Sequence, residues 1–413
     1  LQGHMEMVCE KDADCLIDMA AEGLDLTHND SFVYARGTTL GGDDGIAVAY
    51  ALALLADRNI PHPPLEVVIT VDEEIGMLGA DCIDLSMLKG HKMLNIDSDI
   101  EGHFLTSCAG GMTVETMIPV TYDAASGLLC EVKVTGLEGG HSGSEIDKEH
   151  GNANIIMGRV LKALSDEMEI GIAELAGGLR DNAIPRECMA KILVEEEQAA
   201  TLKDIVASLN KVLANEFMAS DAGVNVVVTE LGTKEAAILS VASMAKVIFY
   251  LRNVPNGVQH MSRIMPGLVE TSLNLGIMEL KEDVFMIETS IRSSVKTRKE
   301  DVREKIINII EILGGEAEVM GDYPAWEYRK NSPLRDVMEN VYSDTFGKKP
   351  QIEIIHAGLE CGLFASKISD FAVAFSPHTP ITVHPTDSSL TPALPLIAPL
   401  KLSIGQGARY AQS

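Results

Sequence analysis

Histidines and carboxylates stand directly after several segments that read as β-strands, where they could bind a metal ion. The apolar runs 65–71 and 92–96 lead into acidic residues, and a short apolar stretch near the C-terminus leads into a histidine. With the first segment and the start of a helix predicted over 41–56, the set is His4, Glu6, Asp43, Asp44, Glu73, Glu74, Asp97 and His384. Ligands of an open parallel sheet bind beyond the carboxyl ends of its strands. Clustered carboxylates repel one another unless a cation neutralises them, so the set predicts a metal site.

The donor types narrow the choice of metal. Oxygen ligands alone would suit magnesium or calcium, whereas two histidines with carboxylates and no thiolates favour zinc, manganese or cobalt. Each of these residues taken singly is more simply read as a solvated turn. Only their coincidence at several strand ends indicates a site.

The elements that would position these residues alternate between strand and helix. Strands predicted over 65–71 and 92–96 flank the acidic residues, and the helix 41–56 opens with Asp43 and Asp44, which suit a helix N-terminus. Such alternation predicts an α/β fold with a mostly parallel sheet covered by helices.

The middle of the chain has a different, α+β character. We predict strands over 128–135, 224–229 and 285–295 and helices over 152–165, 202–217, 241–251 and 301–313. The α/β pattern resumes through 351–355 and 371–375. We therefore expect a catalytic domain in two parts, 1–112 and 321–413, interrupted by an inserted α+β lid and dimerisation domain at 113–320.

Composition excludes several classes of protein. The 413 residues include 33 basic and 61 acidic side chains, a net charge of −28, which disfavours nucleic acid and membrane surfaces as partners. No apolar stretch approaches the roughly 18 residues that span a bilayer. Seven scattered cysteines without a CxxC pair indicate a reducing, cytoplasmic location. The first residues read as the end of a strand, which leaves open whether an upstream part of the domain is missing.

Seven segments together carry a resemblance to a known family. They are Gly3-His4-Met5-Glu6-Met7-Val8, Thr39-Leu40-Gly41-Gly42-Asp43-Asp44-Gly45, Val71-Asp72-Glu73-Glu74-Ile75-Gly76, Leu94-Asn95-Ile96-Asp97, Gly139-Gly140-His141-Ser142-Gly143, Asn182-Ala183-Ile184-Pro185 and His356-Ala357-Gly358-Leu359-Glu360-Cys361-Gly362. In order and spacing they resemble the co-catalytic zinc peptidases of the M20 family. The last three are similar to its aminoacyl-histidine dipeptidase branch, the cytosol nonspecific dipeptidase group.

The resemblance implies two Zn2+ ions per subunit, with Co2+ or Mn2+ as substitutes. Asp43 would bridge the two ions, His4 and Asp97 would complete one coordination shell, and His384 and Glu74 would complete the other. Three protein ligands per ion leave room for a shared water, as catalytic zinc sites require. Glu73 would be the general base that takes a proton from this water and returns it to the leaving amine.

Glu6 departs from the family pattern, which has aspartate two residues after the first histidine to hold that ring in its ligating tautomer. Glutamate carries the same carboxylate on a longer stem, so we expect ring orientation to survive at some cost in metal affinity or rate. Near His384, Ser388 replaces the family's usual acidic residue.

The resemblance also assigns residues to the substrate. His141 would donate a hydrogen bond to the developing oxyanion, across a cleft or from a partner subunit. Asn182, Arg292 and Gly358 match positions that hold the substrate, and an arginine can bind a carboxylate through two parallel hydrogen bonds.

The implied function is hydrolysis of dipeptides, of the Xaa-His type and related short peptides, by a water bridging two zinc ions in a homodimeric enzyme. A related deacylase or aminotripeptidase of the same family is one alternative. The other is a non-catalytic metal-binding homologue, which the change at Glu6 motivates.

Overall fold

The computed structural model describes residues 1–413 apart from 30–31, 99, 369–371, 376–390 and 393–413. The chain forms two compact units. One comprises Leu1–Cys108, Trp326–Ile355 and the described residues from Leu359, and the other comprises Ala109–Ala325 with His356–Gly358. The boundaries predicted after residues 112 and 320 stand four and five residues from these divisions (112 against 108, and 320 against 325).

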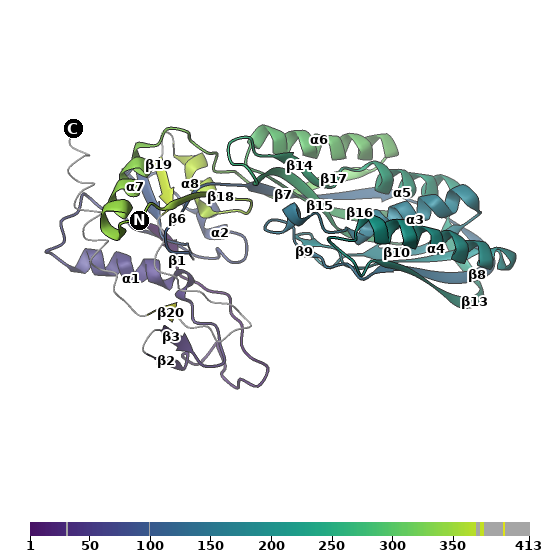
Figure 1. The fold of residues 1–413 in the computed structure, drawn as a ribbon, viewed down its shortest axis with the longest axis horizontal. Coiled ribbons are helices and arrows are strands. Elements are labelled where there is room, and N and C mark those ends of the chain that lie inside the picture. The colour runs from purple at the N-terminus through teal and green to yellow at the C-terminus, as the bar shows by residue number, and fades with distance from the viewer. Residues whose placement is uncertain (30–31, 99, 369–371, 376–390, 393–413) are drawn as a thin grey trace. The chain divides into compact units, whose positions relative to one another are not determined.

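A parallel sheet in the order β19-β5-β1-β4 forms the centre of the first unit (Figure 1). Its strands are β1 Gln2–His4, β4 Val68–Thr70, β5 Lys92–Asn95 and β19 Ala372–Phe375. Gln2 pairs with both Val68 and Asn95, so β1 has a partner on each side. Because every pairing in this sheet is parallel, the carboxyl ends of its strands meet at one edge. The predicted α/β fold is confirmed.

Helix α1, Gly42–Ala56, packs on β1. Ala47, Tyr50, Ala51 and Leu54 are buried at the spacing of one helical face. Asp43 has φ −83° and ψ 109°, outside the helical range, so its backbone precedes the regular helix. The acidic pair is thus presented at the helix N-terminus, next to the end of β1.

The remaining elements of this unit lie outside this sheet. They are β2 Leu26–His28, β3 Phe32–Ala35, β6 His103–Cys108, β18 Gln351–Ile355, β20 Thr391–Pro392, α2 Leu78–Cys82, α7 Pro333–Phe346 and α8 Glu360–Lys367. Strands β6 and β18 pair in parallel, and β3 pairs antiparallel with β2 and β20. Helix α7 begins at a Ser332 cap, whose side chain accepts a hydrogen bond from the backbone N–H of Arg335, and has Pro333 in its first turn.

The second unit is built on a nine-stranded antiparallel sheet in the order β13-β8-β12-β10-β15-β16-β7-β17, with β14 paired to β15. Its strands are β7 Gly110–Pro119, β8 Tyr122–Thr135, β10 Gly171–Gly177, β12 Cys188–Val194, β13 Asn225–Leu239, β14 Gly257–Met261, β15 Val269–Leu280, β16 Val284–Ser293 and β17 Glu316–Tyr323. A separate two-stranded ribbon joins β9 Gly140–His141 to β11 Ala183–Ile184.

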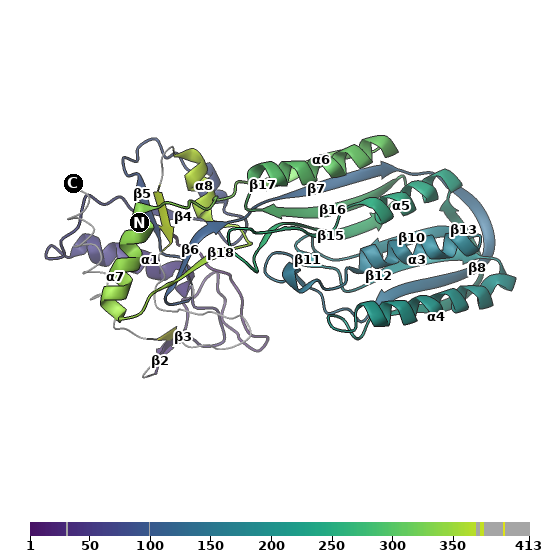
Figure 2. The same ribbon diagram turned by 45° about the horizontal axis from the view of Figure 1, so that its top comes forward.

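Four helices lie over one face of this sheet (Figures 1 and 2). They are α3 Ala153–Glu167, α4 Ala199–Glu216, α5 Val241–Asn253 and α6 Lys296–Leu313. Asn152 caps α3 by accepting hydrogen bonds from two backbone N–H groups, and Ser240 caps α5 with one. The core between helices and sheet is a single apolar cluster that includes Val132, Leu161 and Ile287. The α+β character predicted for the middle of the chain is what the structure has.

Candidate metal centre

The end of β1 and its neighbours supply the candidate ligands of the first unit. His4 is the last residue of β1, and Asp97 follows the end of β5 by two residues. Strand β4 ends at Thr70, before Glu73 and Glu74. These two neighbours would face opposite ways on a regular strand, and the end of the strand removes that obstacle to a shared site.

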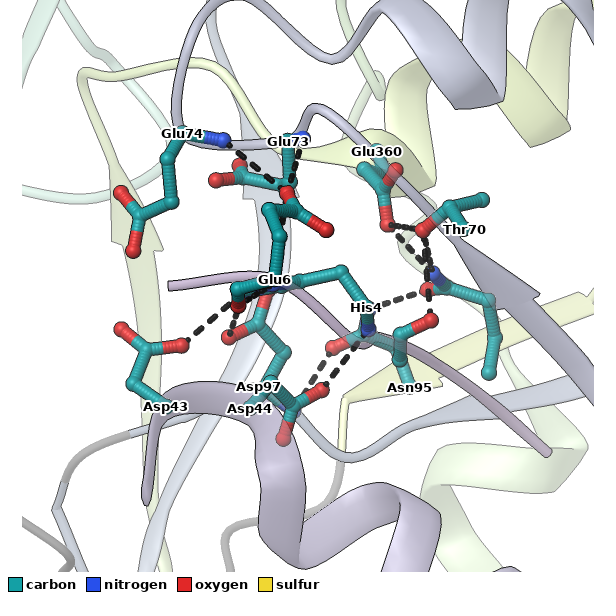
Figure 3. Close-up of polar contacts among 12 residues, drawn as sticks. His4, Glu6, Asp43, Asp44, Thr70, Glu73, Glu74, Asn95, Asp97 and Glu360 are labelled. Atoms are coloured by element: carbon teal, nitrogen blue, oxygen red, sulfur yellow. Dashed lines mark hydrogen bonds and ion pairs between the residues drawn. The ribbon is translucent and has the colours of Figure 1, made fainter. Parts of the chain in front are cut away.

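These side chains lie close together around the ring of His4 (Figure 3). Its Nε2 lies 3.0 Å from Asp43 Oδ1 and 3.7 Å from Asp97 Oδ1. Its Nδ1 donates a hydrogen bond to the backbone carbonyl of Glu6 at 3.0 Å. A proton fixed on Nδ1 leaves Nε2 as the atom that faces the carboxylates, which is the tautomer a metal ligand needs.

Two groups of donors are each compact enough to hold a cation. His4, Asp44 and Asp97 form one, and His4, Asp43 and Glu74 form the other, with ligand atoms within 4.8 Å of one another in each. Asp44 is fully buried, and its Oδ1 has no hydrogen-bond partner among the described residues. An orphaned buried carboxylate oxygen is costly unless a cation takes it up. The imidazole and carboxylate donors fit zinc, manganese or cobalt.

The pKa values show how poorly this cluster tolerates its own charge. Burial raises the pKa of Asp44 to about 8, aided by the charge of Asp43. Burial also raises the pKa of Asp97 well above its usual range, with the same two aspartates adding to the effect. For His4, burial lowers the pKa, but the hydrogen bond that the protonated ring donates to Asp43 and the neighbouring negative charges outweigh burial and raise the pKa to about 10. Without a metal, bound protons thus reduce the negative charge of this cluster, and divalent cations would neutralise the same charge.

Glu73 has the electrostatics of a base that works near neutral pH. Its side chain is partly buried, and burial raises its pKa to about 7, together with the charges of Glu74, Glu360 and Asp43. A general base is most effective when its pKa lies near the working pH.

Glu6 reaches further than an aspartate would. Its Oε1 accepts hydrogen bonds from the backbone N–H groups of Glu73 and of Glu74, the latter at 3.3 Å, and lies 3.5 Å from His4 Nδ1. The longer stem therefore connects the end of β1 to the loop that follows β4. Its carboxylate points into the cluster rather than to solvent (Figure 3).

The second unit gathers the predicted substrate-binding residues. His141 in β9 pairs with Ala183 in β11, and the backbone carbonyl of Asn182 accepts a hydrogen bond from Ser142 N at 2.9 Å. His141 Nδ1 accepts hydrogen bonds from the backbone N–H groups of Gly143 and Ser144, each at 3.2 Å. Burial and the charge of Arg292 lower the pKa of His141. The ring is thus neutral with its proton on Nε2, the form that can donate to an oxyanion.

Arg292 lies on β16, and not all of its N–H donors are used in hydrogen bonds among the described residues. Its Nη1 donates to Tyr323 Oη at 2.9 Å, and its Nε has no partner among the described residues. Next to it, the buried His356 hydrogen-bonds to Ser272 Oγ at 2.8 Å, and burial with the Arg292 charge lowers its pKa to about 3. Gly358 follows His356 by two residues in the same unit. A guanidinium beside neutral groups suits a carboxylate.

Asp44 belongs to the set of residues predicted to bind metal, but the family resemblance gives it no ligand role. Two further residues have no predicted role: His356 reads as a structural histidine, and Glu360 stands in a matched motif. No local pattern separates them from ordinary turn or core residues. His384, the remaining predicted ligand, lies outside the described residues.

Comparison with known proteins decides the family. Residues 1–395 match the model of Peptidase family M20/M25/M40. The chain belongs to this family. It is 37% identical over 366 residues to the cytosol non-specific dipeptidase of Escherichia coli (strain K12), a match that covers 88% of this chain and 75% of that protein. The crystal structure of aminoacylhistidine dipeptidase from Vibrio alginolyticus superimposes with a TM-score of 0.88 at 32% identity, covering 100% of this chain and 83% of that one.

Membership of the M20/M25/M40 family confirms the predicted enzyme class, a metal-dependent peptidase and hence a hydrolase. The donor set around His4 agrees with the use of divalent metal. In the part of the chain that the structure describes, no helix is long and apolar enough to cross a membrane.

Proposed function

We propose that this protein hydrolyses dipeptides, with those carrying a C-terminal histidine among its substrates, and that it does so with two zinc ions per subunit. The observation that carries the proposal is that the carboxylates of Asp43 and Asp97 both lie close to Nε2 of His4, at the carboxyl end of β1. The names of the two similar proteins, a non-specific dipeptidase and an aminoacylhistidine dipeptidase, support the substrate class.

The proposed ligand roles are those that the family resemblance implies, and each of the two donor groups contains part of this set. Asp43 would be a ligand of both ions, His4 and Asp97 would hold one of them, and Glu74 with His384 would hold the other. Two divalent cations held there would polarise the scissile carbonyl and acidify a water molecule. Glu73 accepts the proton of the attacking water and returns it to the leaving amine, so that one peptide bond and one water yield two amino acids. Glu6 fixes the loop that carries Glu73 through its bonds to that loop's backbone.

The second unit is proposed to bind the substrate. Arg292 would pair with the C-terminal carboxylate of the dipeptide, and Asn182 and Gly358 would hold its backbone. His141, with its proton on Nε2, would donate to the oxyanion that forms from the scissile carbonyl. We further propose a homodimer, since β13 is an edge strand of the large sheet and an edge strand can pair with a second chain.

A cytoplasmic location is proposed from the cysteines. All seven lie in the described residues as free thiols, and Cys108, Cys130, Cys188 and Cys361 are buried. Free thiols are the normal state in a reducing compartment.

The test is hydrolysis of glycyl-histidine by the purified protein, first treated with a chelator and then given Zn2+, Mn2+ or Co2+. We expect activity to disappear with the chelator and to return with metal, at two ions bound per subunit. Asp97→Asn should lose metal and activity, whereas Asp14→Asn, at an exposed position, should keep both. Preferred cleavage of an N-acyl amino acid or a tripeptide would favour the deacylase or aminotripeptidase alternatives. Tight metal binding without hydrolysis of any of these substrates would favour a non-catalytic homologue.

A further inference from the structure

A buried cluster of polar side chains lies behind the candidate metal centre. It consists of Gln2 on β1, Thr70 on β4, Asn95 on β5 and Glu360 at the start of α8, exposed by 1%, 3%, 0% and 1% respectively. Strands of a parallel sheet covered on both faces are usually almost entirely apolar. Polar residues on three neighbouring strands of such a sheet therefore require an explanation, and none of them belongs to the proposed ligand set.

Hydrogen bonds join the four side chains into one network, and Figure 3 shows the contact between Glu360 and Thr70. Oε2 of Glu360 accepts from Gln2 Nε2 and from Thr70 Oγ1, the latter at 2.8 Å. Gln2 Oε1 in turn accepts from Asn95 Nδ2. Glu360 Oε2 thus connects β1 and β4 directly, and Gln2 Oε1 extends the connection to β5.

Each strand in this network leads to a residue of the metal centre. Gln2 precedes His4 by two residues on β1, and Thr70 is the last residue of β4, three before Glu73. Asn95 is the last residue of β5, and its Oδ1 accepts a hydrogen bond from the backbone N–H of Asp97 at 3.1 Å. The position of each strand end is therefore tied to Glu360.

Packing alone does not explain a buried glutamate at position 360. It forms no salt bridge to lysine or arginine among the described residues, and its Oε1 has no hydrogen-bond partner there. A buried carboxyl group without a cation costs free energy that an apolar residue of similar size would not. A glutamate at this position is explained if its carboxylate oxygen is needed to accept the hydrogen bonds of Gln2 and Thr70.

We propose that Glu360 is a positioning residue for the metal centre. By accepting from Gln2 and Thr70, and through Gln2 holding Asn95, it sets the spacing of the three strand ends before a metal binds. Among the described residues, the hydrogen bonds of the Glu360 carboxylate go to Gln2 and Thr70, and neither of these is a proposed ligand. This inference rests on the proposed metal site of the preceding subsection.

The experiment measures Zn2+ affinity by competition with a chelator, and the absorption spectrum of the Co2+-loaded protein, for Glu360→Leu and Glu360→Gln. Loss of an outer hydrogen-bond partner of a metal site typically costs about 10–100-fold in metal affinity. We expect a loss in that range and an altered Co2+ spectrum for Glu360→Leu. Glu360→Gln keeps an acceptor oxygen and should stay within a few-fold of the parent protein. Melting of the metal-free proteins shows that each variant is folded.

Ser107→Ala is the matched control. Ser107 is fully buried in the same unit and donates to the backbone carbonyl of Trp326 at 2.7 Å. Its loss should lower the melting temperature without changing Zn2+ affinity. If Glu360→Leu does not fold, Thr70→Val carries the test, because it removes one donor to Glu360 at nearly constant volume and should weaken Zn2+ binding severalfold.

The inference is overturned if folded Glu360→Leu, or Thr70→Val in its place, binds Zn2+ like the parent protein. It is also overturned if Glu360→Gln loses as much affinity as Glu360→Leu, or if Ser107→Ala weakens binding equally. A parent protein that binds no divalent metal would instead refute the proposed function.

Discussion

Replacing Gly3 by alanine tests whether the contact between β1 and the start of α1 sets the geometry of the metal centre. A Cβ at Gly3 would lie 2.2 Å from Asp44 Oδ2 and 2.4 Å from Ala47 Cβ. Real Cβ atoms essentially never approach another atom within 3.0 Å, so the backbone at residue 3 or the side chain of Asp44 must shift until the Cβ and Oδ2 are at least 0.8 Å further apart (3.0 − 2.2). The same oxygen accepts a hydrogen bond from the backbone N–H of His4 at 3.2 Å. The shift therefore acts on two candidate ligands together.

The size of the effect follows from this displacement. Overpacking by one methyl group costs about 1–3 kcal/mol of stability, and a misplacement of about 1 Å at an active site can cost on the order of 100-fold in rate. We expect Gly3→Ala to weaken Zn2+ binding by about tenfold or more, which corresponds to about 1.4 kcal/mol per factor of ten. Chelator competition measures the affinity, and thermal unfolding of the metal-free protein measures the stability.

Gly45→Ala is the control for this change. A Cβ at Gly45 would meet no atom within 4 Å, and the residue lies in α1. Alanine there should raise stability by about 0.5–1 kcal/mol and leave Zn2+ affinity unchanged. Parent-like Zn2+ affinity in Gly3→Ala would show that the contact between β1 and α1 does not set the centre, and the reasoning would be refuted.

Three further predictions follow from the same structure. Glu73→Gln should lower kcat by about 10²–10⁴-fold at unchanged metal content, and retained activity would remove Glu73 as the base. Without metal, stability should fall as the pH rises from about 4 to about 8, because the raised pKa values of Asp44 (about 8) and Glu73 (about 7) mean that the folded state binds more protons than the unfolded state in this window. Melting temperatures across this range, with chelator and with Zn2+, measure the slope, and a rise with pH in chelator would contradict the prediction. Lys299→Met should destabilise the second unit by about 1.5–3 kcal/mol, because the buried ammonium donates to two backbone carbonyls and to Asp322, while Zn2+ affinity stays unchanged. Denaturant unfolding checks this, and equal stability would show that solvent replaces those bonds.

The sequence alone determined which residue types stand after which strands. Apolar runs with β-branched residues must form strands, and the acidic residues that follow them cannot be buried without compensation. From this pattern the α/β fold, the metal-dependent class and the family could be predicted, and each is confirmed. The helix predicted over 41–56 agrees with α1 to one residue at its start, because Asp43 and Asp44 favour a helix N-terminus.

Only the tertiary structure decided which strands are neighbours. Local patterns cannot specify that β1 lies between β5 and β4, since strand order depends on how distant segments pack. That order brings Asp97 within 3.7 Å of His4 across more than ninety residues of chain. It also buries Asp44, and it places Glu360 on the side chains of Gln2 and Thr70. The surroundings of a carboxylate change its properties strongly only when the fold excludes water from it. The spacing of residues in the sequence could therefore predict the metal-binding side chains of this centre, but not the residues that hold them in place.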